Sequence, residues 1–254
     1  MIPPCYVITL NKTLGKQGEA LKKAGLDPIL FQGIDGRKGE HKYYENKLKP
    51  LYNKVGTKSS KGCSLSHLLL CEKLYKEGIE LALILEDDAY PFENINLSDE
   101  IEKVINDVPD DWEIIKLHCD MFCEDGSNLQ KSLFNGSAAA YLINTKGLHV
   151  LNNTSMKLQF DNHINIVNKV YKTKKNLFWA DESYSTQRGS NEKYIFEPFL
   201  NFLFPIKTGE KTWGTFLNSK WFTIPFTTIE VTKIQILTFI FVVTGLIIFY
   251  YINR

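Results

Sequence analysis

Residues 81–90 read LALILEDDAY, and the architecture of the chain can be argued outward from them. An uninterrupted apolar run, Leu81–Leu85, leads directly into three acids, Glu86, Asp87 and Asp88. A continuous apolar run of this length is typical of a strand buried on both faces, as in a parallel sheet covered by helices. The sequence therefore predicts an α/β domain with three carboxylates at the carboxyl end of one of its strands.

Acids at the end of such a strand lie where open α/β sheets bind their ligands. Because side chains alternate along a strand, we expect Glu86 and Asp88 to share one face and Asp87 to point to the other. Mg²⁺ and Mn²⁺ prefer carboxylate oxygens and are commonly held by one or two carboxylates plus a substrate diphosphate. The pattern favours a metal–diphosphate site at Glu86 and Asp88, with a plain solvated turn before Pro91 as the alternative.

The first 36 residues have the order strand, helix, strand. A β-branched segment, 5–10, predicts the first strand, helix formers at 19–24 predict the helix, and PILFQGI at 28–34 predicts the second strand. The second strand stops at Asp35-Gly36, which is a strong turn signal. This order is a βαβ unit, which implies two parallel strands joined by a right-handed crossover.

The basic segment 37–61 lacks a clear period, and we expect it to be an exposed excursion at the sheet edge. Leucines at helical spacing then predict a buried helix over 64–77 with Ser64 as its N-cap. Ser66 and His67 are adjacent within it, and a histidine beside an apolar stripe is often a satisfied structural residue.

Downstream, periodicity predicts a helix over 97–108, a strand over 112–117, a strand rich in small residues over 136–143 and a short helix over 145–151. The segment Phe160-Asp161-Asn162-His163 is the second concentration of polar side chains. Asp161 is either the N-cap of a helix that begins near Ile164 or a functional acid.

Composition narrows the class of protein. A chain of 254 residues suits one sizeable α/β domain or two small ones. Lys and Arg number 30 against 29 Asp and Glu, which speaks against a nucleic-acid binder. The start of the chain lacks the pattern of a cleaved signal peptide, so we expect reduced thiols. His118, Cys119 and Cys123 indicate zinc only weakly, because no second pair completes a tetrahedral set.

Residues 234–251, IQILTFIFVVTGLIIFYY, carry no charge. Their length is near the lower limit for spanning ~30 Å of hydrocarbon as a helix, and the closing tyrosines suit a membrane interface. We predict a single-pass C-terminal membrane anchor behind a catalytic domain over residues 1–225, with that domain on the cytosolic side.

Taken together, these segments resemble glycosyltransferase family 25, which contains bacterial lipopolysaccharide β-galactosyltransferases and procollagen galactosyltransferases. The blocks that carry the resemblance lie within residues 6–164: YVITLN, FQGIDGRKG, KGCSLSHLLLCEKL leading into LALILEDDAYP, and GSAAAYLINTKGLHVL followed by FDNHI. The most specific feature is GCxLSH upstream of an apolar strand that ends in EDD.

The resemblance implies a GT-A type, Rossmann-like nucleotide-sugar transferase that uses Mn²⁺ or Mg²⁺ and inverts the anomeric carbon. It would move a hexose, galactose or glucose, from a UDP-sugar to a glycan, a lipid-linked sugar or a protein hydroxyl, as in lipopolysaccharide biosynthesis. Glu86 and Asp88 stand at its DxD-like metal motif, with Asp88 the leading candidate for direct contact. The residues implied to bind or line the donor are Thr9, Leu10, Asn11, Asp35, Gly36, Ser66, His67 and Asp87.

On the acceptor side, the resemblance points to Asp161 and His163. We expect Asp161 to be the catalytic base, with Asp181 and Glu182 as alternates. The chain departs from the family by offering lysines rather than arginines shortly after the first strand. A phosphoryl-transfer enzyme is disfavoured because no GxxxxGK[ST] motif is present. A non-catalytic, membrane-anchored sugar- or nucleotide-sugar-binding domain remains the alternative.

Overall fold

The computed structural model describes residues 2–93, 95–118, 129–131, 137–173, 175–181, 220–223 and 230–232. The chain divides into two compact units, Met1–Glu192 and Lys193–Arg254. In the second unit only an antiparallel pair, β10 (Lys220–Thr223) and β11 (Glu230–Thr232), is described. The site discussed below belongs to the first unit.

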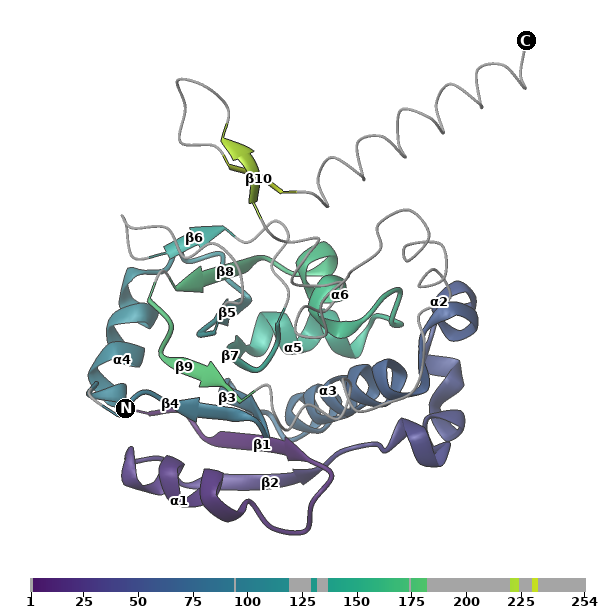
Figure 1. The fold of residues 1–254 in the computed structure, drawn as a ribbon, viewed down its shortest axis with the longest axis horizontal. Helices are drawn as coiled ribbons and strands as arrows, with labels where there is room; N and C mark the ends of the chain where they lie inside the picture. Colours follow the sequence, from purple (N-terminus) through teal and green to yellow (C-terminus); the bar gives the residue numbers. More distant parts are fainter. Residues whose placement is uncertain are drawn as a thin grey trace. The chain divides into compact units, whose positions relative to one another are not determined.

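A seven-stranded sheet with the order β2-β1-β3-β7-β5-β8-β6 forms the centre of the first unit (Figure 1). Its strands are β1 (Cys5–Thr9), β2 (Pro28–Gln32), β3 (Leu81–Glu86), β5 (Ile114–Lys116), β6 (Leu129–Lys131), β7 (Ala140–Asn144) and β8 (Val170–Thr173). β1 runs parallel to both β2 and β3, which confirms the predicted parallel pair at the start of the chain.

The sheet is mixed rather than purely parallel. β7 pairs antiparallel with β3 on one side and with β5 on the other. Residues Ala82–Leu85 are nevertheless fully buried, as the apolar run predicted. Burial on both faces produces such a run whatever the direction of the neighbouring strand, so the run could not reveal the antiparallel neighbour.

Helices cover both faces of the sheet. α3 (Lys58–Lys76), α5 (Thr145–Asn152) and α6 (Phe160–Val167) bury leucines, Phe160 and Ile164 in one hydrophobic cluster with Ile84 and Tyr141. α1 (Gly15–Lys23) and α4 (Leu97–Asp107) contribute to a second cluster with Leu83 and Leu85. Figure 1 shows α4 on one side of the sheet and α3, α5 and α6 on the other. Successive residues of β3 therefore face different cores.

The segment predicted to be an irregular excursion is largely helical. It contains η1 (Gly36–Lys38), η2 (Glu40–Lys47), α2 (Pro50–Val55) and the start of α3. The N-cap of α3 is Thr57, whose side chain accepts the Ser60 N–H, so the prediction of Ser64 as N-cap was wrong. Ser64 is buried inside the helix, where its hydroxyl contacts the Tyr52 hydroxyl and accepts the Phe160 N–H. The first turns of α3 are polar, so the apolar periodicity begins after the helix does.

Two short strands, β4 (Ala89–Pro91) and β9 (Phe178–Ala180), pair antiparallel directly after the three acids. The Asp181 N–H donates to the Asp88 carbonyl at 2.8 Å. This bond extends the pairing to the acidic turn, which consists of Glu86, Asp87 and Asp88. The segment around Asp181 is thereby fixed next to Asp88.

Asp161 lies in the first turn of α6, whose N-cap is Gln159. The alternative in which Asp161 is itself the N-cap is therefore wrong. Because α6 begins earlier than expected, Asp161 stands at a position where a side chain can face a neighbouring element rather than its own helix end.

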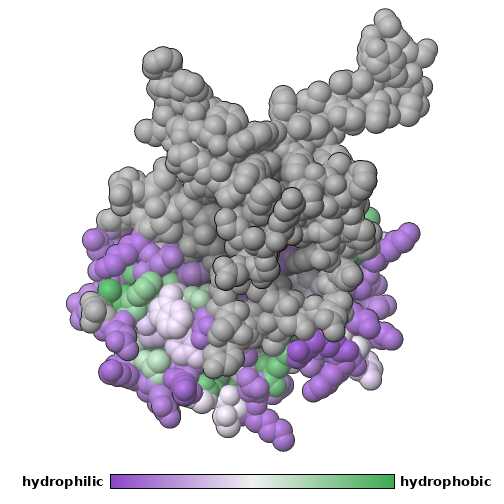
Figure 2. Space-filling model, in the orientation of Figure 1, coloured by the Kyte–Doolittle hydropathy of each residue, from purple (hydrophilic) through white to green (hydrophobic). Residues whose placement is uncertain are grey.

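On the face drawn in Figure 2, the visible coloured residues are mainly hydrophilic, with apolar residues between polar ones. Within the ranges given above, no helix is long and apolar enough to cross a membrane. The anchor predicted over residues 234–251 lies outside those ranges, as do Cys119, Cys123 and Glu182.

Candidate active site

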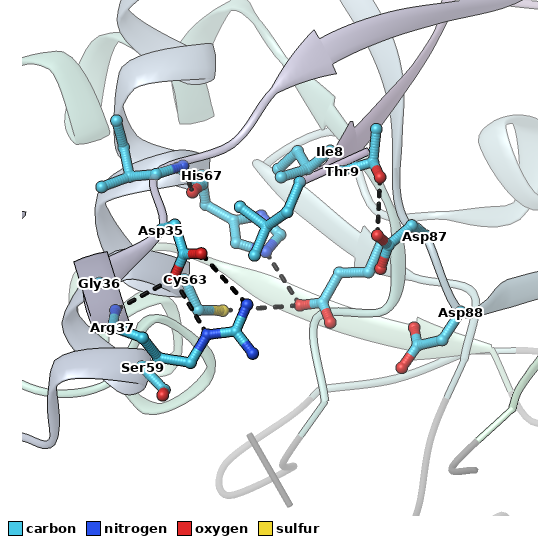
Figure 3. A pocket seen from close by; sticks show the side chains of 14 residues that line it. Ile8, Thr9, Asp35, Gly36, Arg37, Ser59, Cys63, His67, Asp87 and Asp88 are labelled. Carbon is cyan, nitrogen blue, oxygen red and sulfur yellow. Dashed lines mark hydrogen bonds and ion pairs between the residues drawn. The ribbon is translucent and has the colours of Figure 1, made fainter. Parts of the chain in front are cut away.

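A pocket opens at the carboxyl ends of β1 and β3, beside the loop that follows β2 (Figure 3). Its empty space, including the part open to solvent, is about 640 Å³. It is lined by Ile8, Thr9, Leu10, Ile34, Asp35, Gly36, Arg37, Ser59, Cys63, Ser66, His67, Glu86, Asp87 and Asp88. This position is the one at which open α/β sheets bind ligands.

The acidic turn is held by hydrogen bonds from β1 and α1. Thr9 Oγ1 donates to Asp87 Oδ2 at 2.7 Å, which joins the ends of β1 and β3. Gln17 Nε2 donates to the carbonyls of Glu86 and Ala89, at 2.7 and 2.8 Å. The three carboxylates therefore stand on a turn whose backbone is fixed from both ends.

Glu86 faces the interior side of the pocket. His67 Nε2 lies 3.0 Å from Glu86 Oε1, and the Cys63 thiol lies 3.8 Å from the same oxygen. Figure 3 shows Asp87 directed toward Thr9. One oxygen of Glu86 is thus engaged by protein groups in the structure.

His67 is fully buried between β7 and α6. Its Nδ1 lies 3.0 Å from the Tyr141 hydroxyl, and its ring stacks on Phe160 at 4.3 Å between centroids. Burial lowers the pKa of His67 to about 4, so the imidazole is neutral near pH 7. In the neutral form Nε2–H donates to Glu86 while Nδ1 accepts from Tyr141, and His67 thereby orients the carboxylate.

Asp88 fits a divalent cation. Its Oδ1 is buried and lacks a hydrogen-bond partner among the residues described here, which is costly for a carboxylate unless a ligand fills the gap. Burial and then the charges of Glu86 and Asp87 raise the pKa of Asp88 to about 7. A hard cation bound by Asp88 and Glu86 would neutralise this concentration of negative charge.

The loop after β2 forms the opposite wall of the pocket. Asp35 accepts hydrogen bonds from the backbone N–H and the guanidinium of Arg37, and this contact holds the pKa of Asp35 low. Ser66 Oγ accepts the Ile34 N–H at 2.7 Å and donates to the Gly62 carbonyl at 2.8 Å. A Cβ on Gly36 would lie 1.8 Å from the Lys58 carbonyl oxygen, so only glycine permits this approach of the loop to α3.

Asp161 is partly buried and does not line the pocket, but it lies within its electrostatic reach. Burial and then the Glu86 charge raise the pKa of Asp161, while Lys116, His67 and the Ser137 N–H act in the opposite direction. Ser137 has a φ of 80°, an uncommon conformation for a residue other than glycine. A backbone held in this way presents its N–H to the Asp161 carboxylate.

Two residues expected to touch ligands lie elsewhere. His163 is fully buried, and its Nδ1 accepts the Lys157 N–H at 3.3 Å, so its side chain belongs to the core beneath α6. Asn11 is exposed and does not line the pocket, and its N–H donates to Thr9 Oγ1. These positions do not favour direct roles for the two side chains.

Several residues that the structure brings to the pocket were not selected from the sequence, among them Ile8, Ile34, Arg37, Ser59 and Cys63. Cys63 alone carried a usable signal. It belongs to the GCxLSH block, four residues before His67. The predicted helix began at Ser64 and left Cys63 out, whereas α3 includes both residues and places their side chains on one helical face.

Comparison with known proteins gives one family. The family described as glycosyltransferase family 25 (LPS biosynthesis protein) matches residues 2–164. No curated protein is similar enough in sequence to count as a relative.

Among solved structures, A197 from STIV shares 8% identity over 68% of this chain and 81% of its own, with a TM-score of 0.42. A glycosyltransferase involved in glycosylation of the major capsid of PBCV-1 shares 11% identity over 59% of this chain and 63% of its own, with a TM-score of 0.35. Mouse xyloside xylosyltransferase 1 shares 10% identity over 66% and 81%, with a TM-score of 0.34. These structures are only distantly similar to this chain.

Proposed function

The chain belongs to glycosyltransferase family 25, and on this premise we propose that it transfers a hexose from a UDP-sugar to a hydroxyl acceptor with inversion, using Mn²⁺ or Mg²⁺. The donor hexose is galactose or glucose. The acceptor is a glycan, a lipid-linked sugar or a protein hydroxyl. The observation that carries the proposal is the pocket in which three consecutive carboxylates face the loop after β2.

The donor would occupy this pocket. Thr9, Leu10, Asp35 and Gly36 supply the wall for uridine, and Asp88 with Glu86 would hold the cation beside the diphosphate. When bound, the cation neutralises charge that builds on the departing diphosphate.

The chain's own acids complete the reaction. The acceptor oxygen forms a bond to the anomeric carbon on the face opposite the diphosphate, while the bond to the diphosphate oxygen breaks and its electron pair leaves with UDP. Asp161 takes the acceptor's proton. Burial and then the Glu86 charge raise the pKa of Asp161, which makes its carboxylate a stronger base.

Binding of UDP-galactose, UDP-glucose and UDP-N-acetylhexosamines with Mn²⁺ tests the proposal directly. We expect one of these donors to bind and to be slowly hydrolysed, and Asp88→Ala to lose both binding and hydrolysis. Asp99→Ala, a change to an exposed acid at the start of α4, serves as the matched control. Donor binding without hydrolysis or transfer would instead favour a non-catalytic nucleotide-sugar-binding domain. Unchanged turnover in Asp88→Ala would refute the metal assignment.

The place of the reaction follows from the C-terminal segment. An anchor over residues 234–251 would tether the catalytic unit to a membrane, with the unit on the cytosolic side.

A further inference from the structure

Three different donor atoms lie close together next to Asp88, which with Glu86 forms the proposed metal–diphosphate site, here called the carboxylate site. Cys63 Sγ, His67 Nε2 and a carboxylate oxygen of Glu86 all lie within 4.8 Å of one another. Cys63 and His67 are one turn apart on α3, and Glu86 ends β3. We propose that these side chains form a second cation site, selective for a thiophilic divalent ion such as Zn²⁺ over Mn²⁺ and Mg²⁺.

The spacing of the donors is close to that of a zinc site. Zinc bonds to sulfur, nitrogen and oxygen of ~2.0–2.3 Å in a tetrahedral site place neighbouring donors roughly 3.3–3.8 Å apart. Cys63 Sγ is 3.8 Å from Glu86 Oε1, and His67 Nε2 is 3.0 Å from the same atom. Binding therefore needs only a small separation of the imidazole from the carboxylate. The fourth position is left for water or a ligand from the pocket.

The surroundings of His67 provide the support that a metal-bound imidazole needs. A ligating histidine usually donates its other N–H to an oxygen, which fixes the ring and its tautomer. His67 Nδ1 already lies 3.0 Å from the Tyr141 hydroxyl, and the ring stacks on Phe160. On zinc binding the imidazole proton moves from Nε2 to Nδ1, and Tyr141 becomes the acceptor.

The three donor atoms favour Zn²⁺, and Zn²⁺ bound to them would affect the site formed by Glu86 and Asp88. Thiolate and imidazole are ligands that favour Zn²⁺, whereas Mg²⁺ and Mn²⁺ favour oxygen. Cys63 releases its thiol proton to solvent on binding. Because Glu86 also belongs to the carboxylate site with Asp88, zinc would withdraw one ligand from that site and oppose sugar transfer.

Cobalt reports this site in the full chain without any assay of sugar transfer. We would titrate Co²⁺ into the reduced, metal-free protein, follow the thiolate-to-cobalt charge-transfer band, and then displace the cobalt with Zn²⁺. We expect Cys63→Ser to abolish the band and to weaken Zn²⁺ binding by at least about 100-fold, while Tyr141→Phe weakens it by roughly 10- to 100-fold. Cys5→Ser, which changes a buried thiol in the other hydrophobic cluster, should leave the band unchanged.

The rival thiols are Cys119 and Cys123, which follow His118 in the sequence. The double variant Cys119→Ser/Cys123→Ser separates the two sites, because our proposal predicts that it keeps the band. A band that survives in Cys63→Ser, or that disappears in the double variant, would overturn the proposal, as would equal affinity for Mn²⁺ and Zn²⁺. If Cys63→Ser does not fold, Cys63→Ala supplies the same comparison. Failure of donor binding would leave this result untouched, so the two proposals can fail separately.

Discussion

Asp88 and Asp161 both have raised pKa values, but their surroundings suit them to different tasks. Asp88 has a buried oxygen without a hydrogen-bond partner in the described part of the chain. The charges of Glu86 and Asp87 act on it as well, and such a concentration of negative charge attracts a cation. The Lys116 charge and a hydrogen bond from the Ser137 N–H stabilise the ionised form of Asp161. Carboxylates placed in such different environments commonly divide metal binding and proton transfer between them.

Substitution of Asp161 tests this division. We expect Asp161→Asn to lower kcat for transfer by about 10²- to 10⁴-fold, because a positioned base contributes a factor of that size. Affinities for Mn²⁺ and for the donor should change little, since Asp161 does not line the pocket. Steady-state kinetics and calorimetry measure the two effects. Asp181→Asn provides the comparison: if it alone lost transfer, the base would be Asp181, and loss of metal binding in Asp161→Asn would make Asp161 a ligand.

His163 gives a pH dependence of stability that is separate from the site. Burial lowers its pKa from 6.5 to about 4, so the unfolded chain binds a proton that the folded chain does not bind between these values. Its contribution is complete above pH 6.5 and is lost as the pH falls toward 4. Urea unfolding between pH 4.5 and 7.5 should show that His163→Asn has a shallower pH slope than the parent, by about one proton. Parallel slopes would contradict the neutral, buried assignment.

At the scale of elements, α1 positions the acidic turn through a single side chain. Gln17 donates to the carbonyls of Glu86 and Ala89, and it is almost fully buried. This connection links a helix that does not itself line the pocket to the backbone that carries the carboxylates. Changes at Gln17 should therefore affect both the stability of the fold and the geometry of the cation site.

Gln17→Leu keeps the approximate size of the side chain and removes both hydrogen bonds. We expect a loss of about 2 kcal/mol in the free energy of unfolding, because two buried carbonyls lose their donor. Mn²⁺ affinity should fall as well, since the turn is no longer fixed. Urea unfolding and Mn²⁺ titration measure these changes. Gln32→Leu is the control, because Gln32 is exposed and donates one bond of 3.3 Å to the Thr9 carbonyl. Equal effects at the two positions would argue against the role given to Gln17.

Elements with strong periodicity could be predicted from sequence, and elements fixed by tertiary contacts could not. The strand before EDD and the helix that starts at Leu97 were found because burial alone sets their patterns. The start of α3 was missed because Ser64 looks like a cap in isolation. In the fold its hydroxyl is taken by Tyr52 and by the Phe160 N–H, which are distant in sequence.

The same division applies to the site. The three acids were expected at the end of a strand because of the apolar run before them, and Thr9 and Asp35 were assigned to the donor site by the resemblance. The structure brings all five residues to one pocket, where the carboxyl ends of neighbouring parallel strands meet. The contact between His67 and Tyr141 could not be foreseen, since it requires α3 to pack against a strand that runs antiparallel to β3. The apolar pattern of a strand buried on both faces is the same for parallel and antiparallel neighbours. The residues around Glu86 could therefore not be predicted from the sequence.

At the scale of the whole molecule, the pocket and the predicted membrane anchor belong to different units of the chain. Both hydrophobic clusters consist of residues from the first unit, and the pocket lies within that unit too. The apolar segment 234–251 belongs to the second unit. The catalytic unit should therefore keep its fold and its ligands when that segment is changed.

Removal of residues 234–254 tests the membrane anchor. We expect the full chain to sediment with membranes and to resist extraction by salt and alkali, because an apolar segment of this length is near the minimum that spans ~30 Å of hydrocarbon. A chain that ends at Lys233 should remain in the soluble fraction and bind Mn²⁺ and donor as the parent does. Val242→Arg/Val243→Arg keeps the length of the chain and should also release it, since each arginine at the centre of a spanning helix costs about 2.5–3.5 kcal/mol. Val242→Leu/Val243→Leu should stay bound. Retention of the shortened chain on membranes would place the attachment elsewhere in the protein, and release of the full chain by salt would show that the contact is electrostatic rather than an inserted helix.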